Sequence, residues 1–257
     1  QDNSTMALSS RGYDGSIGPN DFERLGGCES GHLAFDPDSP RYVYGGCYLG
    51  IIDEFDRQNH TSRSVRAYEE LGLGEQAINQ VYRMNWNAPI VASRFEPSVI
   101  YHGSQYILRT DDRGFNWAEI SPDLTRNEAD KQGETGYPYT NENIEVYNTI
   151  FAIAESAHRA DTLWAGTDDG LLHITTDGGS SWNDVTPINV DRGYINMIET
   201  SPHDEGTAYV VVDNHKFGDD SPYIYRTTDN GDSWRMIIDG IPDYEFARVV
   251  REDPQHR

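Results

Sequence analysis

Short apolar segments alternate with polar turns along the whole chain. Each repeat of the pattern has an apolar strand, a polar turn that often contains proline, and a second strand that ends in an aromatic residue and small residues. The layout recurs at 32–46, 90–103, 151–166 and 196–211, and its first part recurs at 246–257. Runs of this length, bounded by turn residues, are typical of β-strands. Because helical periodicity is weak almost everywhere, the pattern predicts an all-β chain.

One eight-residue motif occurs three times, each time after the expected third strand of a repeat. It reads TDDRGFNW at 110–117, TTDGGSSW at 175–182 and TTDNGDSW at 227–234. The aspartate can accept hydrogen bonds from the backbone N–H groups of a turn, and the glycine permits a positive φ. The tryptophan then returns the chain to a strand and packs beneath the turn. The motif therefore predicts structural turns built on Asp112, Gly114 and Trp117, on Asp177, Gly179 and Trp182, and on Asp229, Gly231 and Trp234.

The two patterns combine into units of four strands. The aromatic residues that mark the second strands, Tyr44, Tyr101, Trp164 and Tyr209, are 57, 63 and 45 residues apart. This period is that of β-propeller blades, so the predicted fold is a propeller of four-stranded antiparallel blades. About four blades are expected, at 31–66, 88–120, 148–186 and 194–238. The segments 1–30 and 246–257 are expected to end a preceding blade and begin a following one, as parts of a larger propeller.

The three octets, called Asp boxes below, resemble those of BNR-type β-propellers. That repeat family includes sialidases, xyloglucan-cleaving glucanases and the sortilin ectodomain. The chain is most similar to bacterial sortilin-like BNR proteins, which are often labelled glycosyl hydrolase, and the similarity extends over essentially the whole chain. It is carried by QDNST (1–5), GGCESGHLAFDP (26–37), RMNWNAP (83–89), ISPDLTRN (120–127), WAGTDDGL (164–171) and REDP (251–254). The resemblance implies an exported protein that is secreted, periplasmic or on the cell surface, with its signal peptide outside this chain.

Three functions remain open, and no catalytic residue is assigned. Sialidases of this family carry an Arg-Ile-Pro motif, whereas this chain has Gly-Ile-Pro at 240–242, so sialidase activity is not expected. We expect a non-catalytic module that binds peptide, protein or glycan. One alternative is a glycoside hydrolase with a pair of loop carboxylates, which cannot be recognised by spacing among 43 acidic residues. The other alternative is a structural repeat of a surface assembly.

The expected ligand-binding surface is the face opposite the Asp boxes. In a four-stranded meander, this face carries the loops between the second and third strands and the connections between blades. It holds the long insertions at 69–86, 122–147 and 213–222. Long loops on a rigid scaffold are where function is usually found. The candidate ligand-binding residues on this loop face are Arg83, Trp86, Asp168, Asp169, Asp213 and His215.

Most of these candidates also have a structural interpretation. Asp168 and Asp169 either bind a sugar hydroxyl or a cation, or cap backbone N–H groups of a turn. Trp86 either forms a carbohydrate platform with Arg83 or belongs to the core. The tyrosines of 136–147 either stack on a ligand or pack within their own loop.

Two further groups of polar residues were considered. The stretch 213–220 is a weak Ca²⁺ candidate through Asp213, Asp219 and Asp220, and a solvated loop is the alternative. His102 is expected to be a hydrogen-bonded histidine at a strand end. No other cofactor is expected.

The charge of the chain limits its partners. It has 43 acidic and 20 basic residues and a net charge of −23. Nucleic acid is therefore not expected as a partner, because such binding depends on clustered Lys and Arg. No apolar run approaches the roughly 20 residues needed to cross a bilayer, so membrane insertion is not expected. An acidic surface with only two lysines suits either concentrated salt or an ordinary secreted protein.

The chain has two cysteines in similar settings, Cys28 in GGCES and Cys47 in GGCYL. They form a disulfide if the compartment is oxidising, and two buried thiols are equally compatible with the sequence. Neither belongs to a Cys/His cluster with zinc-ligand spacing, so a structural zinc site is not expected.

Overall fold

The structure is a computed structural model that describes residues 5–12, 15–29, 31–69, 72, 74–133 and 146–256. Strands and short 3-10 turns make up the regular structure of this part of the chain, which contains no α-helix. The strands form four antiparallel sheets of four strands each and one two-stranded ribbon. The all-β fold class predicted from the apolar pattern is confirmed.

Each sheet is a meander whose strands follow one another in sequence. The first comprises β3 (Leu33–Phe35), β4 (Tyr42–Gly46), β5 (Ile52–Asp56) and β6 (Thr61–Ser64). The second comprises β7 (Ile90–Ala92), β8 (Ile100–Gly103), β9 (Ile107–Thr110) and β10 (Ala118–Glu119). The third comprises β11 (Ile150–Glu155), β12 (Leu163–Thr167), β13 (Leu172–Thr175) and β14 (Asn183–Asp184). The fourth comprises β15 (Tyr194–Thr200), β16 (Ala208–Asp213), β17 (Tyr223–Thr227) and β18 (Arg235–Met236).

The remaining elements are short. The ribbon pairs β1 (Met6–Leu8) with β2 (Phe22–Arg24) in antiparallel register. Single 3-10 turns occur at η1 (Pro19–Asp21), η2 (Tyr48–Gly50), η3 (Ala77–Asn79), η4 (Ala129–Lys131) and η5 (His215–Phe217). η2 lies in the short connection between β4 and β5, and η3, η4 and η5 lie in the long insertions at 69–86, 122–147 and 213–222.

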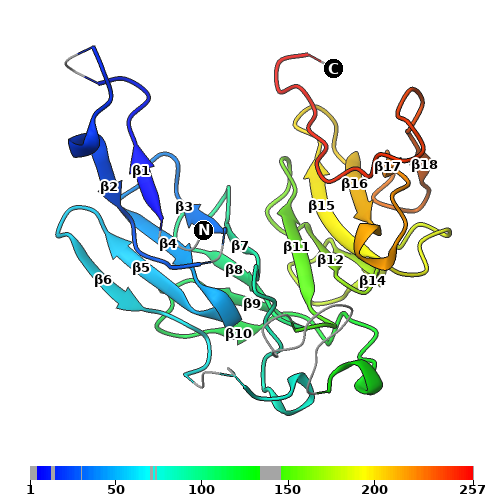
Figure 1. Cartoon of the computed structure of the whole chain (residues 1–257), viewed down its shortest axis with the longest axis horizontal. Helices are drawn as coiled ribbons and strands as arrows, with labels where there is room; N and C mark the ends of the chain where they lie inside the picture. The colour runs from blue at the N-terminus through cyan, green and yellow to red at the C-terminus, as the bar shows by residue number, and fades with distance from the viewer. Residues whose placement is uncertain are drawn as a thin grey trace.

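Successive sheets contact one another through their first strands. β3 contacts β7, β7 and β8 contact β11, and β11 contacts β15. In Figure 1 the first two sheets lie on the left and the last two on the right, with these first strands toward the middle of the molecule. The arrangement is that of consecutive propeller blades.

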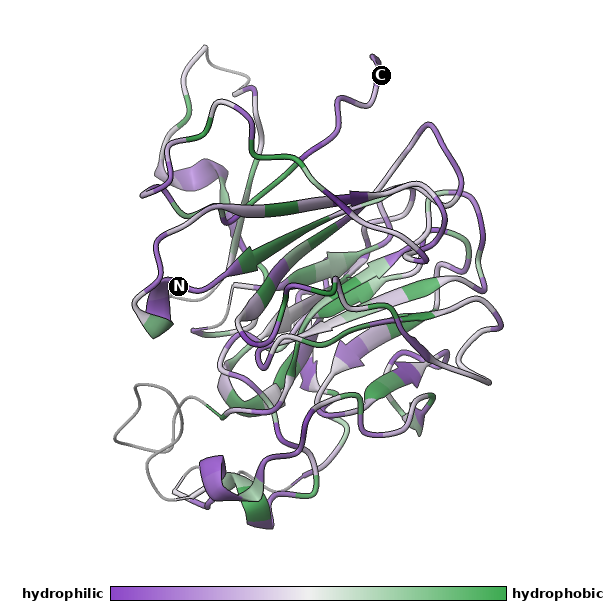
Figure 2. Ribbon diagram, turned by 90° about the vertical axis from the view of Figure 1, so that its right-hand side faces the viewer, coloured by the Kyte–Doolittle hydropathy of each residue, from purple (hydrophilic) through white to green (hydrophobic). Residues whose placement is uncertain are grey.

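A separate apolar core fills each interface between neighbouring sheets. The first and second sheets share a core that includes Tyr44, Ile52, Ile90 and Ile100. The second and third share Tyr101, Ile107, Ile150 and Leu163. The third and fourth share Trp164, Leu172, Ile195, Val210 and Val212. Figure 2 shows the apolar residues concentrated on the strands. Burial of each large side chain contributes about 1.5–3 kcal/mol, so these cores hold the sheets face to face.

The glycine that ends the second strand of a sheet allows the next sheet to come close. At Gly103 an added Cβ would lie 3.1 Å from Cγ2 of Ile150, on the first strand of the following sheet. Gly166 meets Ile195 in the same way, and a Cβ there would collide with the isoleucine. In the second and third sheets, the glycine of the sequence repeat is therefore a packing requirement.

The Asp boxes form the turns between the third and fourth strands of three sheets. In the box at 175–182, the Asp177 carboxylate accepts hydrogen bonds from the Ser181 backbone N–H at 2.9 Å and from the Thr175 hydroxyl at 2.8 Å. Gly179 has a φ of 96°, and an added Cβ would lie 2.5 Å from the carbonyl oxygen of Ile120. The turn thus lies directly on the preceding sheet. The other two boxes repeat these bonds.

The structure joins Cys28 and Cys47 in a disulfide, with Cα atoms 4.7 Å apart. The backbone N–H of Cys28 also donates to the carbonyl oxygen of Gly46 at 3.1 Å. The bridge therefore attaches the segment that precedes the first sheet to the end of β4. The sequence was compatible with either a disulfide or two free thiols. In the structure the two backbones lie close enough for the disulfide to form.

Candidate functional site

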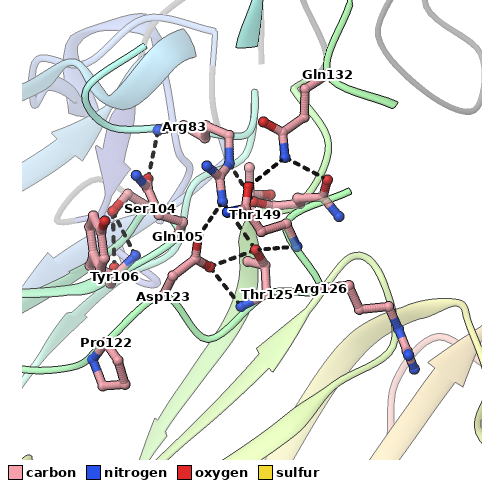
Figure 3. A network of polar contacts seen from close by, with 12 residues as sticks. Arg83, Ser104, Gln105, Tyr106, Pro122, Asp123, Thr125, Arg126, Gln132 and Thr149 are labelled. Carbon is pink, nitrogen blue, oxygen red and sulfur yellow. Dashed lines mark hydrogen bonds and ion pairs between the residues drawn. The ribbon is translucent and has the colours of Figure 1, made fainter. Parts of the chain in front are cut away.

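A network of polar side chains lies beneath the loop face, between the second and third sheets (Figure 3). Its centre is Arg83, which is buried. The guanidinium donates to the carbonyl oxygen of Asn148 at 3.1 Å and to Oδ2 of Asp123 at 2.8 Å. It also donates to Oγ1 of Thr125 at 3.1 Å. Arg83 is therefore satisfied within the protein, and it supports the loops instead of presenting its charge to a ligand.

Asp168 and Asp169 are fully buried in the same network. The carboxylate of Asp168 accepts from the backbone N–H and the hydroxyl of Thr149, at 2.8 and 2.7 Å. Asp169 accepts from Nδ2 of Asn148 at 2.6 Å and from the backbone N–H of Arg126 at 2.9 Å. These contacts match the structural interpretation, in which the two carboxylates cap backbone N–H groups.

The buried position also changes how this pair titrates. Burial raises the pKa of Asp168 well above its ordinary value, and the neighbouring charge of Asp169 raises it further. Burial likewise raises the pKa of Asp169. Because neither carboxyl is exposed, neither faces a ligand from the solvent side in this conformation.

Gln105 connects the network to the surface loop above it. Its Oε1 accepts from the backbone N–H of Arg83 at 2.8 Å, and its Nε2 donates to the carbonyl oxygen of Val81 at 2.9 Å. A single buried side chain thus holds both ends of the segment 81–83. Sequence reasoning missed Gln105, because a glutamine in a short loop has no distinctive pattern.

A pocket opens beside this segment on the loop face, and we call it the tyrosine pocket. Among the residues that line it, we call Tyr68 and Tyr82 its walls, Leu49 and Met84 its floor, and Asn79 and Gln80 its rim. The rings of Tyr68 and Tyr82 meet edge to face, with centroids 6.1 Å apart. None of these residues was named as a candidate from the sequence, although Asn79, Gln80, Tyr82 and Met84 fall within the insertion 69–86. The available signal was the pair of tyrosines, Tyr68 just before the insertion and Tyr82 within it.

Trp86 lies close to this region but in a different contact. Its indole stacks on the ring of Tyr48, with centroids 5.1 Å apart and planes 30° apart. The residue is partly exposed. Trp86 belongs to none of the described apolar cores, and because Arg83 is buried and bonded within the protein, the two residues do not form a platform together.

Asp213 and His215 lie together on the loop face of the fourth sheet. Asp213 is buried and accepts from Nδ1 of His215 at 2.6 Å. Nε of Arg248 lies 3.3 Å from its other oxygen. The His215 ring stacks on Phe246 with centroids 4.5 Å apart. Both candidates are thus engaged with the segment that follows the fourth sheet.

The weak Ca²⁺ candidate does not converge on one point. Asp219 accepts from the Tyr223 hydroxyl at 2.7 Å and from the backbone N–H of Ser221 at 3.0 Å. Asp220 is exposed. Among the described residues, no three His, Cys, Asp or Glu side chains are placed to hold a metal ion. The solvated-loop alternative describes this stretch better.

His102 differs from the expectation of a fully hydrogen-bonded histidine. Its Nδ1 lies 2.9 Å from the carbonyl oxygen of Pro89, but in the described structure its buried Nε2 has no partner. Burial lowers the pKa of His102 to about 4, so the ring is neutral at pH 7. Of the tyrosines considered in 136–147, Tyr147 is buried, and the others lie outside the described residues.

Comparisons with known proteins point to one enzyme class. No model of a known protein family matches the chain. A segment of 88 residues is 33% identical to the oligoxyloglucan-reducing end-specific xyloglucanase of Emericella nidulans, and it covers 33% of this chain and 10% of that protein. The structure of an ancestral GH74 enzyme matches with a TM-score of 0.51 and 15% identity, over 80% of this chain and 23% of that one. The GH74 xyloglucanase from Xanthomonas campestris matches with a TM-score of 0.55 and 20% identity, over 82% of this chain and 31% of that one.

These comparisons establish the fold and shift the balance between the functional hypotheses. The chain has the fold of a section of the propellers in GH74 enzymes, and it spans less than a third of each of these relatives. A sortilin-like relationship finds no support among them. The glycoside hydrolase alternative is therefore better supported than the non-catalytic module that we expected from the sequence. In the described part of the chain, no helix is long and apolar enough to cross a membrane.

Proposed function

We propose that the chain is a section of a glycoside-hydrolase-type propeller whose loop face binds a neutral β-glucan of the xyloglucan class. The observation that carries this proposal is that one similar sequence is a xyloglucanase and that two similar structures are GH74 enzymes. Because the chain spans only a fraction of these relatives, the hydrolytic activity of a whole protein is part of the proposal.

The charge and the surface chemistry of the chain support a neutral polysaccharide. A net charge of −23 repels anionic polymers. The tyrosine pocket combines aromatic walls with amide side chains at its rim, and the residues that line it include no Lys or Arg. Apolar walls with a few polar groups are typical of sites for small uncharged ligands.

One observation favours a second candidate, a glycan-binding module without hydrolysis of its own. The loop-face carboxylates that the sequence suggested, Asp168, Asp169 and Asp213, are buried and hydrogen-bonded within the protein. A glycosidase needs two carboxyl groups on either side of an accessible bond. In this version, another part of a longer protein supplies the catalytic pair.

We also propose that further blades continue the propeller. Nε2 of His158 in the third sheet hydrogen-bonds the carbonyl oxygen of Ser201 in the fourth, at 3.1 Å. Nε2 of His203 in the fourth sheet makes the same bond to Asp253, at 2.7 Å. These two equivalent bonds support the proposal that the segment 246–256 begins a further blade. As in the sequence-based expectation, the protein is proposed to be exported.

Incubation of the purified protein with xyloglucan, xylan and an unbranched β-1,4-glucan tests the proposal. Affinity electrophoresis measures binding, and release of reducing ends measures hydrolysis. Hydrolysis of xyloglucan supports the enzyme, and binding without hydrolysis supports the module. Absence of binding to all three polymers overturns the proposed function.

A further inference from the structure

We propose that the tyrosine pocket is a subsite for one neutral sugar ring of the glucan, with Tyr68 as its stacking platform. The inference rests on the proposed function and assigns it to particular residues. Tyr68 is 45% exposed, although its ring also meets that of Tyr82 at a nearly perpendicular angle. A large aromatic face held open at a pocket is suited to the apolar C–H face of a sugar ring.

The wall behind Tyr68 is rigid. The Tyr82 hydroxyl donates to Oε1 of Glu119 at 3.0 Å, and burial together with this bond raises the pKa of Tyr82 to about 12. Tyr82 also meets the ring of Tyr106 edge to face, with centroids 6.2 Å apart. The three tyrosines form a ladder that extends from the pocket onto the second sheet. A preorganised wall lowers the entropy lost when a ligand binds.

The backbone of the pocket is held from below. Gln105 binds both Val81 and Arg83, so the segment that carries Tyr82 is attached to the buried polar network. The proposed role of the Arg83 network is therefore to position the pocket wall, without itself contacting a ligand.

The floor of the pocket depends on a glycine. Gly50 has a φ of 73°, and an added Cβ would lie 2.6 Å from Cγ of Met84. Only glycine therefore allows the Met84 side chain to lie against η2 and form an apolar floor with Leu49. A larger residue at this position would push Met84 into the space assigned to the ligand.

The polar groups of the pocket suit hydroxyl groups and disfavour an anion. Asn79 is exposed beside the pocket, and Nε2 of Gln80 donates to the carbonyl oxygens of Gly72 and Glu75, each at 3.3 Å. These two bonds fix the orientation of the Gln80 amide in the pocket lining. Glu75 adds an acceptor that would repel an anion. The combination disfavours an anion and suits a ligand rich in hydroxyl groups.

Titration calorimetry of the whole chain with xyloglucan oligosaccharides and with cello-oligosaccharides tests the assignment. Tyr68→Ala is expected to weaken binding at least tenfold, and Tyr68→Trp to retain it, because the aromatic face and not the hydroxyl makes the contact. Phe115→Ala is the matched control, since Phe115 is 66% exposed in an Asp box on the opposite face. Asn79→Ala, which removes a rim amide, is expected to weaken binding several-fold. Thermal unfolding checks that each variant is folded.

The outcomes separate the subsite from the function on which it rests. If the unmodified chain binds oligosaccharides and both Tyr68→Ala and Asn79→Ala bind equally well, the subsite is wrong while the proposed function stands. If Phe115→Ala loses affinity as much as Tyr68→Ala, the contact lies on the other face. If the unmodified chain binds no oligosaccharide, the proposed function fails and the subsite fails with it.

Discussion

The indole Nε1 of Trp182 donates a hydrogen bond to the carbonyl oxygen of Ile120 at 2.8 Å, across the boundary between two sheets. Ile120 is the residue directly after β10. The same bond recurs between Trp117 and Val65 at 2.8 Å and between Trp234 and Val185 at 2.7 Å. Each Asp box therefore closes its own turn and at the same time attaches its sheet to the outer edge of the preceding one.

Trp182→Phe is expected to lower the free energy of unfolding by about 1–2 kcal/mol, because it removes the bond and leaves the Ile120 carbonyl without this partner. Urea denaturation measures the change. Tyr244→Phe, at a side chain that is 76% exposed, is the control and should leave stability unchanged. Equal stability of the Trp182 variant and the unmodified protein would show that the bond between sheets contributes nothing.

The Asp boxes make stability fall in acid. Hydrogen bonds from the backbone N–H and amide of Asn116 lower the pKa of Asp112 from its ordinary value of 3.8 to about 2. Hydrogen bonds from Ser181 and Ser233 lower the pKa of Asp177 and of Asp229. A lowered carboxyl pKa means that the unfolded chain binds protons first, so this stabilisation is present above about pH 4 and is lost as pH falls toward 2.

The triple variant Asp112→Asn, Asp177→Asn, Asp229→Asn should therefore be less stable at pH 7 and should show a flatter decline between about pH 4 and 2. Unfolding in urea at a series of pH values measures both effects. An unchanged slope in this window would contradict a role for the Asp boxes.

His102 is expected to destabilise the protein at mildly acidic pH. Burial lowers its pKa from 6.5 to about 4. Between pH 6.5 and pH 4, His102 is therefore protonated in the unfolded chain and neutral in the folded protein. Stability consequently falls as pH decreases through this window, by up to about 3 kcal/mol. His32, whose pKa burial also lowers, acts in the same direction.

His102→Gln tests this effect, since glutamine does not titrate and keeps a donor for Pro89. The variant should lose part of the decline in stability between about pH 6.5 and 4, measured by urea unfolding. The measurement is repeated with His256→Gln as the control, because that histidine side chain is 79% exposed. A decline as steep as that of the unmodified protein would mean that His102 is not the group responsible.

Arg83→Met is expected to destabilise the protein by about 3 kcal/mol, since it leaves the part-buried carboxylate of Asp123 without its partner. The double variant with Asp123→Asn should recover part of this loss. Urea denaturation of both single variants and the double variant gives the coupling energy. A coupling near zero would mean that the two residues contribute independently.

Reduction of the Cys28–Cys47 bridge should lower stability by about 3 kcal/mol, the loop-closure value for a separation of 19 residues. The melting temperature with and without dithiothreitol measures the effect. The Cys28→Ser, Cys47→Ser variant should melt at the temperature of the reduced protein and should not respond to the reductant. A reductant effect in that variant would place the sensitivity elsewhere.

What the sequence determined about this protein is its repeating local structure. The residues that form the turn, Thr175, Asp177 and Gly179, lie within five positions of the sequence, and apolar runs indicate the strands on either side. Local hydrogen bonds and backbone preferences act over such short distances, so the all-β fold could be predicted. The same reasoning left open whether Asp168 and Asp169 face a ligand or cap a turn, because acidic residues in loops are usually exposed.

Only the tertiary structure decided what the loop face consists of. Arg83 bonds to Asn148, 65 residues away, and this contact buries a residue that the sequence presented as a ligand contact. Tyr68, Tyr82 and Tyr106 meet because two connections fold over neighbouring sheets. Whether a polar or aromatic side chain is buried or exposed depends on segments distant in the sequence that pack over it. A local sequence pattern contains no information about such long-range contacts.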